Sequence, residues 1–423
     1  MSGISVDHIV SIIIFLAAIL LFVGLFGQIV QPAVTYQQNQ AVSTKCSDLL
    51  DNMLLNPGSP SNWGQENSAP TSFGVQNPEF TQYQLSAFSL MRLSPATGNF
   101  IEYDKTTPNI YYNELTSGPG TFLLTPTAQA LNYSAALSLL GINGTYGFQL
   151  TLTPDITVSI TQKQASSPLE LSVSAAGAGF PFANATINYC LILVTLGQTS
   201  AQYPSYTIQN GAVSTDQQGM AIQGANNYLS FSNVQNPDQV YAFIAYAQLD
   251  GIVGVGYLTH DTSPNPDQYV VPIVQDIGSQ AVALANNYDL NDSGPAGSSL
   301  QYNATFVIST EDYALSELSL GSSDNIGLVG TVTSGVGNPY PTISMPTSTT
   351  GILIVTYQVN STEGGVVMMP WGISSLAFPI TFGGNPQQQT WVATDLRQVM
   401  IGNVAYQAKL SLWSTQGLSQ ETV

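Results

Sequence analysis

A long apolar run near the start of the chain constrains the fold more than any other feature. Residues Ile9–Val30 are interrupted by polar side chains only at Ser11 and Gln28. As an α-helix this run is roughly 33 Å long, enough to cross a hydrocarbon core of about 30 Å. It is longer than the apolar core of a secretory signal, and no Lys or Arg precedes it. We therefore expect a tail at residues 1–8 and a retained single-pass transmembrane helix at residues 9–31, in contact with membrane lipid.

A second helical pattern follows Pro32, where we expect a kink or a restart of the helix. Apolar side chains then recur at the spacing i, i+4, i+7, i+8 and i+11, the stripe of an amphipathic helix. This stripe consists of Val42, Cys46, Leu49, Leu50 and Met53. Asn56-Pro57-Gly58 ends the pattern, which predicts a stalk helix at residues 32–56. The stripe packs either on the globular part of the same chain or on the stalks of neighbouring subunits, and the sequence leaves both readings open.

The charge balance excludes one class of partner. The chain has 6 basic and 25 acidic residues, a formal net charge of −19, and this charge repels phosphate backbones. We therefore expect no nucleic-acid binding. Charged residues are only 7% of the chain, against about 25% in ordinary soluble domains. Polarity comes instead from Gln, Asn, Ser, Thr and Tyr, which stay hydrated at any pH, so we expect the bulk of the chain to lie outside the cell.

Beyond the stalk the sequence predicts a mainly β protein with three units. Residues 57–165 form a small α+β unit, with a helix at Tyr133–Leu140 followed by two short strands. Residues 166–262 carry β-branched runs spaced as in an antiparallel sandwich, after a linker QASSP at 164–168. Residues 263–423 form a second β-rich sandwich unit. It ends in a hairpin about Gly402-Asn403.

Two stretches resemble archaeal proteins of the type IV pilin class. They are LLDNMLLNPGSPSNWG at Leu49–Gly64 and NYSAALSLLGINGTYGFQLTLTP at Asn132–Pro154, following the apolar helix. The resemblance implies cleavage by a special peptidase and an acidic side chain at the fifth mature position, which neutralises a neighbour's amino terminus during filament assembly. Counting from Gly3, Asp7 is fifth, although no Lys or Arg precedes it. The resemblance thus marks Asp7, together with the stalk stripe, as candidate assembly residues.

The second unit resembles immunoglobulin-like modules of prokaryotic surface proteins. The stretches GAGFPFANATINYCLILV and GAVSTDQQGMAIQ carry this likeness, and the turn TDQQG is similar to the T-D-x-x-G turn that joins two strands in such modules. The resemblance implies a β-sandwich. Modules of this kind serve as spacers, adhesins or enzyme appendages, so no function follows from the fold.

Catalytic and metal-binding patterns are scarce. The only histidines, His8 and His260, cannot form a multi-histidine metal site in one chain. Asp289–Gly294 places oxygen ligands as in an EF-hand loop, but the twelfth position is Leu300 instead of Glu. We therefore expect no cofactor, no metal and no enzymatic activity.

Cysteines and sequons complete the candidate sites. Cys46 and Cys190 are expected to be buried apolar residues instead of a disulfide pair. Six Asn-x-Ser/Thr sequons lie beyond the apolar run and are candidate N-glycan acceptors: Asn132, Asn143, Asn184, Asn291, Asn303 and Asn360.

These features favour a structural protein of the cell surface. It would be a pilus-like filament subunit, an adhesin or an envelope component that associates with itself or other surface proteins. One alternative is a membrane-tethered carbohydrate-binding protein or hydrolase, with Trp371, Trp391 and Trp413 stacking on sugars unless they pack in the core. Another is a surface protein of an archaeal virus. A pocket with convergent carboxylates would favour the carbohydrate reading, and an open sheet edge would favour assembly.

Overall fold

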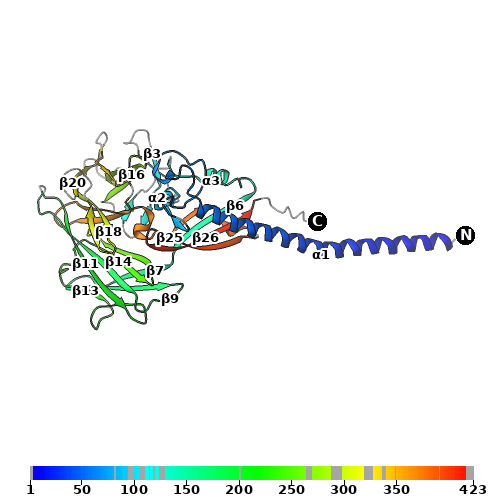
Figure 1. The fold of residues 1–423 in the computed structure, drawn as a ribbon, viewed down its shortest axis with the longest axis horizontal. Coiled ribbons are helices and arrows are strands. Elements are labelled where there is room, and N and C mark those ends of the chain that lie inside the picture. The colour runs from blue at the N-terminus through cyan, green and yellow to red at the C-terminus, as the bar shows by residue number, and fades with distance from the viewer. Residues whose placement is uncertain are drawn as a thin grey trace.

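A long helix projects from a β-rich body in the computed structural model (Figure 1). The structure describes residues 3–80, 82–93, 100–103, 110–113, 115–117, 120–122, 129–199, 202–262, 269–286, 298–318, 327–335, 340–347, 349–389 and 391–415. The expected class, mainly β with an N-terminal apolar helix, is confirmed.

Helix α1 runs without interruption from Gly3 to Leu55, so the restart expected at Pro32 is wrong. Proline removes one intrahelical hydrogen bond, and the turns on either side keep their own, so one long helix tolerates it. The helix ends where the sequence predicts. Asn56 Oδ1 accepts the Gly58 N–H (2.9 Å), and Gly58 has a φ of +83°, which favours glycine.

The largest sheet has ten strands and joins distant parts of the chain. Its main path is β1-β25-β26-β15-β14-β10-β11-β12, and β6 and β24 lie off this path. The strands are β1 (Gln84–Leu85), β6 (Tyr146–Pro154), β10 (Thr186–Thr195), β11 (Ser205–Thr215), β12 (Ala221–Ile222), β14 (Tyr241–Leu249), β15 (Ile252–His260), β24 (Ile380–Gly383), β25 (Ala393–Ile401) and β26 (Val404–Ser414). The β25–β26 pair confirms the predicted hairpin about Gly402-Asn403.

A second sheet contacts β14 and β15 and encloses a small apolar core with the main sheet. It contains β7 (Ile156–Gln164), β8 (Leu169–Gly177), β9 (Phe180–Pro181) and β13 (Leu229–Phe231). Because β7 pairs with β8, the QASSP stretch expected as a linker is the connection of a hairpin. The TDQQG stretch connects β11 and β12 as predicted, and Asp216 Oδ1 accepts the N–H groups of Gln218 and Met220.

The remaining long strands form two further sheets, which lie against each other. One contains β16 (Val270–Asp276), β17 (Ala281–Asn286) and β21 (Thr342–Ser344). The other contains β18 (Ser299–Ser309), β19 (Leu315–Leu318), β20 (Gly327–Thr333), β22 (Gly351–Gln358) and β23 (Gly364–Trp371). Shorter elements are α2 (Ala87–Met91), α3 (Tyr133–Leu139), β2 (Phe100–Tyr103), β3 (Ile110–Asn113), β4 (Leu115–Ser117), β5 (Gly120–Phe122), η1 (Trp63–Gln65), η2 (Ile373–Leu376) and η3 (Pro386–Gln388). Helix α3 confirms the helix expected at 133–140.

Strand pairing crosses the unit boundaries expected from the sequence. Strand β6, from the α+β stretch, pairs along its whole length with β26 at the other end of the chain, and also with β24. One large apolar core accordingly includes residues of α1, of β6 and of the C-terminal strands. The stalk, the α+β stretch and the C-terminal part therefore fold against one another.

Candidate membrane and assembly surfaces

The first half of α1 is a bare apolar surface. The side chains of Leu20 and Phe22 are 72% and 68% exposed, and this half of the helix extends away from the body (Figure 1). In the described part of the chain, α1 is the one helix long and apolar enough to cross a membrane. Exposure of this surface to water would be unfavourable, because burial of each large apolar side chain contributes about 1.5 to 3 kcal/mol of favourable free energy.

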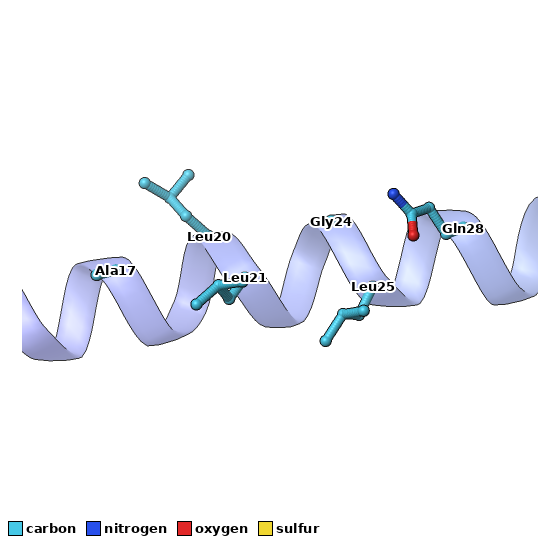
Figure 2. A pocket seen from close by; sticks show the side chains of 6 residues that line it. All are labelled: Ala17, Leu20, Leu21, Gly24, Leu25 and Gln28. Atoms are coloured by element: carbon cyan, nitrogen blue, oxygen red, sulfur yellow. The ribbon is translucent and has the colours of Figure 1, made fainter.

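A shallow groove runs along this half of α1 (Figure 2). Ala17 and Gly24 leave little side-chain bulk, and a Cβ added to Gly24 would meet no atom within 4 Å. Gln28 adds an exposed amide at one end of the groove. Small residues allow close approach of another helix in a bilayer, and a polar side chain there favours hydrogen bonding between helices.

The stripe on the second half of α1 does not form an assembly surface. All five side chains, at Val42, Cys46, Leu49, Leu50 and Met53, are buried in the body's core. This half of α1 packs on β25 and β26 of its own chain. Between the two readings left open by the sequence, the structure selects packing within the chain, because the hairpin supplies an apolar face of matching length.

A polar cluster on the same helix was missed by the sequence analysis. Arg397 of β25 donates to Asp51 of α1 (Nε to Oδ1, 2.9 Å), to Ser47 Oγ (3.0 Å) and to Asp395 Oδ1 (2.8 Å). Tyr83 also donates to Asp51 Oδ1 (3.1 Å). The hydrogen bond with Asp51 is the main cause that raises the pKa of Arg397. The cluster fixes the position of α1 along the hairpin, and no local pattern pairs residues so far apart in sequence.

Arg92, after α2, is a second buried charge that the sequence did not reveal. Its guanidinium donates to the carbonyls of Trp63, Glu66 (2.9 Å) and Ser68 (3.0 Å), and its Nε donates to Gln129 O (2.7 Å). It also lies 5.3 Å from the Trp63 ring centroid. Burial lowers the pKa of Arg92 to about 10. The Arg92 guanidinium thus joins the segment at residues 63–68 to Gln129, which is a structural role.

The candidate glycan acceptors differ in accessibility. Four are exposed: Asn132, Asn143, Asn184 and Asn360. Asn303 is half-buried in β18, which is paired on both sides, so it is the least accessible of those described. Asn291 lies outside the described residues.

The N-terminal candidates lie at the free end of α1. Asp7 is in the first turns of the helix, and its side chain is outside the described part. His8 is exposed.

Both cysteines are buried free thiols, as expected. Cys46 Sγ donates to Leu410 O (3.5 Å), under the β25–β26 hairpin. Cys190 Sγ donates to Tyr313 O (3.6 Å). Burial raises the pKa of Cys46 to about 11 and that of Cys190 to about 12, so both remain protonated at neutral pH.

An open cleft of about 590 Å³ lies at the end of β15, where His260 and Asp261 line it together with Asp238 and Glu363. The carboxylates are largely engaged within the chain. Glu363 accepts from the Asn360 amide (2.7 Å), and Asp261 accepts from the Val366 N–H (3.0 Å). Among the described residues of the cleft, the carboxyl groups of Asp261 and Glu363 are thus each held by a hydrogen bond within the chain.

Asp261 is exposed as a whole residue, but its carboxyl group turns inward toward β22 and β23. A Cβ added to Gly365 would lie 2.9 Å from its Cγ and closer still to the Tyr357 hydroxyl. Burial raises the pKa of Asp261 to about 6. The His260 ring stacks on the Tyr241 ring, with centroids 5.3 Å apart, and its Nε2 lies 3.1 Å from Pro237 O.

The three candidate stacking tryptophans are not gathered at the cleft. Trp371 and Trp413 are buried core residues, and Trp371 Nε1 donates to Pro346 O (2.8 Å). Trp391 is 36% exposed and does not line the cleft.

Metal-binding clusters are absent from the part of the chain that the structure describes: it holds no group of three or more His, Cys, Asp or Glu suited to a metal ion. The loop at Asp289–Gly294 lies outside this part. Leu300 is buried in β18.

Comparisons with known proteins do not assign the chain to a family. No family model and no curated protein matches it. A crystal structure of red sea bream transglutaminase is similar at 9% identity and a TM-score of 0.16, over 56% of this chain and 32% of that one. The chain thus spans about a third of that protein's length. A TM-score this low does not indicate a common fold.

Proposed function

We propose that this chain is a structural protein of the cell surface, anchored in a membrane by the first half of α1, with its β-rich body outside the cell. The observation that carries the proposal is the division of α1. One half is bare and apolar, and the other packs on the body through Leu50, Met53 and the Asp51–Arg397 ion pair. A rigid link of this kind holds the body at a fixed position above the bilayer.

The body would serve as part of a filament subunit, an adhesin or an envelope component, without enzymatic activity. Its surface carries few charges and much Gln, Asn, Ser, Thr and Tyr, which remain hydrated in acidic surroundings. The exposed sequons, at Asn132, Asn143, Asn184 and Asn360, are sites for N-linked glycans on an outward-facing body.

A charge-insertion experiment tests the anchor. The double variant Leu16→Lys/Leu20→Lys places two ammonium groups in the apolar half, at a cost of about 6 kcal/mol for membrane insertion. The control, Gln38→Lys/Gln40→Lys, adds the same charge to exposed positions of the same helix beyond the apolar run. We expect the control and the parent chain to stay in carbonate-washed membranes and the double variant to leave them. Equal retention of all three would refute the anchor.

Electron microscopy of sheared surface material, with mass spectrometry of the chain's amino terminus, tests the filament reading. Filaments that contain this chain, with Gly3 or Ile4 as the first residue, would support assembly through α1. Recovery in the membrane fraction alone, with an uncut amino terminus, would leave an anchored adhesin or envelope component.

A further inference from the structure

A cavity of about 220 Å³ lies where the largest sheet meets the five-stranded sheet that contains β18 and β22. Its lining comes from β14, β15, the end of β18 and the turn after it, the start of β22, η2 and the turn of the β25–β26 hairpin. Among the described residues that line it there is none from α1, and none of the three candidate tryptophans. Junctions between packed elements are common places for small-molecule pockets in proteins.

The cavity has a buried floor and an exposed rim. Tyr246 and Ile352 form part of the floor and are only 4% and 2% exposed. Thr350 and Asn403 also line the cavity and are exposed, and Tyr313 is half-buried. A small molecule can therefore enter from solvent and reach side chains that are shielded from it.

The described side chains that line the cavity are polar but uncharged. The polar groups are hydroxyls and one amide, from Tyr246, Ser309, Tyr313, Thr350, Ser375 and Asn403. Burial raises the pKa of both tyrosines, so each keeps its hydroxyl proton and stays neutral. A charged ligand would lose its hydration here without meeting an opposite charge, which is unfavourable. The lining therefore favours a ligand that is polar and neutral.

Only some of these polar groups are engaged within the chain. The Ser309 hydroxyl interacts with the Tyr246 hydroxyl, and Ser375 Oγ donates to Trp371 O (3.3 Å). In the part of the chain that the structure describes, the side chains of Tyr313, Thr350 and Asn403 have no hydrogen-bond partner. Two hydroxyls and an amide are thus available to a ligand, and each can both donate and accept.

Tyr313 is held in place by the turn that carries it. Its φ is +57°, a conformation that bulky residues rarely adopt. The Tyr313 N–H donates to Thr310 O (3.0 Å), and its carbonyl accepts from Cys190 Sγ (3.6 Å). Its ring packs on that of Tyr246, with centroids 5.4 Å apart. The cavity therefore has a fixed aromatic surface beside its free hydrogen-bonding groups.

We propose that this cavity binds one neutral sugar unit in its pyranose form. The apolar C–H face of such a ring suits the Tyr313 ring, and the hydroxyls around its edge suit Thr350 and Asn403. The volume corresponds to about seven water molecules at roughly 30 Å³ each, which matches a single sugar ring. The described lining residues include no Asp or Glu to act as acid or base, so the site binds the sugar without hydrolysing it. This binding role goes beyond the structural role proposed above and does not depend on the membrane anchor.

Saturation-transfer NMR of the ligand tests the site in the full chain, purified in a detergent that has no sugar headgroup. The probes are the methyl glycosides of glucose, mannose and galactose. We expect the parent chain to bind at least one of them with a Kd of about 1 mM, as is usual for so small a ligand. Methyl glucuronide differs from the glucoside by a carboxylate. It should bind about tenfold more weakly or less, because the lining supplies no opposite charge.

Two substitutions that each remove one hydroxyl locate the bound sugar. We expect Tyr313→Phe and Thr350→Val each to weaken binding of that glycoside about fivefold, because each loses one hydrogen bond to it. The matched control is Tyr203→Phe, which removes the hydroxyl of an exposed tyrosine outside the cavity and should bind like the parent. Thermal unfolding checks that every variant is folded.

The proposal would be overturned if the parent chain bound none of the three glycosides. Unchanged binding by both Tyr313→Phe and Thr350→Val would also overturn it, because the sugar would then lie elsewhere. Equal binding of the glucuronide would contradict the preference for a neutral ligand. Retention of the chain in membranes affects none of these results, so failure of this site and failure of the anchor are distinguishable.

Discussion

Individual charged residues have well-defined structural roles in a chain that has so few of them. Arg92 is 2% exposed and donates to four backbone carbonyls. Arg397 instead joins β25 to α1 through Asp51 and also pairs with Asp395 of its own strand. The planar, always charged guanidinium suits both sites, since it presents five donors in fixed directions. The sequence marks both residues as rare but gives no means of finding their partners.

Asp261 makes stability depend on pH in an unusual direction. Folding raises its pKa from 3.8 to about 6, so between these values the folded chain holds a proton that the unfolded chain has released. The contribution of Asp261 to the free energy of unfolding therefore falls as the pH rises from about 4 to about 6. Asp261→Asn mimics the protonated form, and we expect it to flatten this slope. Thermal unfolding at pH 4 and pH 7 checks this.

The control for Asp261→Asn is Asp238→Asn, at another carboxylate of the same cleft, for which we expect the parent's slope. A slope that survives in Asp261→Asn would show that other groups cause it.

At the scale of elements, local signals were sufficient where the chain pairs with itself nearby. The β25–β26 hairpin, helix α3 and the turn at Asp216 all formed as predicted, because turn residues and apolar periodicity act over a few positions. Pro32 predicted a possible boundary, but helix α1 continues through it. The stripe on α1 was visible in the sequence, but the hairpin that covers it lies more than 300 residues away.

Apolar packing, more than the ion pair, should hold α1 to the hairpin. Leu50 is fully buried, and we expect Leu50→Ala to lower the free energy of unfolding by about 3 kcal/mol. Asp51 and Arg397 are 38% and 25% exposed, so Asp51→Ala should cost at most about 1 kcal/mol. Urea denaturation in detergent measures both. Leu25→Ala, on the bare half of α1, should have no effect on the body, and a larger loss for Asp51→Ala than for Leu50→Ala would reverse the ranking.

The whole molecule shows what spacing along a sequence could not predict. Composition and turn signals indicated a mainly β body, and that class is correct. The pairing of β6 with β26 depends on contacts between residues more than 250 positions apart, which leave no local pattern.

Strand β14 lies between the two apolar cores and should couple them. Phe243 faces the smaller core, and its neighbour Ile244 faces the larger one; both are fully buried. Because one strand serves both cores, we expect the body to unfold in a single calorimetric transition. Phe243→Ala and Ile244→Ala should each lower its midpoint, at a cost of about 3 to 5 kcal/mol.

The surface variant Val329→Ala, at a side chain 53% exposed, should leave this midpoint unchanged. Two separate transitions, one moved only by Phe243→Ala and the other only by Ile244→Ala, would mean that the smaller core unfolds independently of the rest. A single shared transition would mean that a load applied to the distal sheets reaches α1 through a continuously packed body.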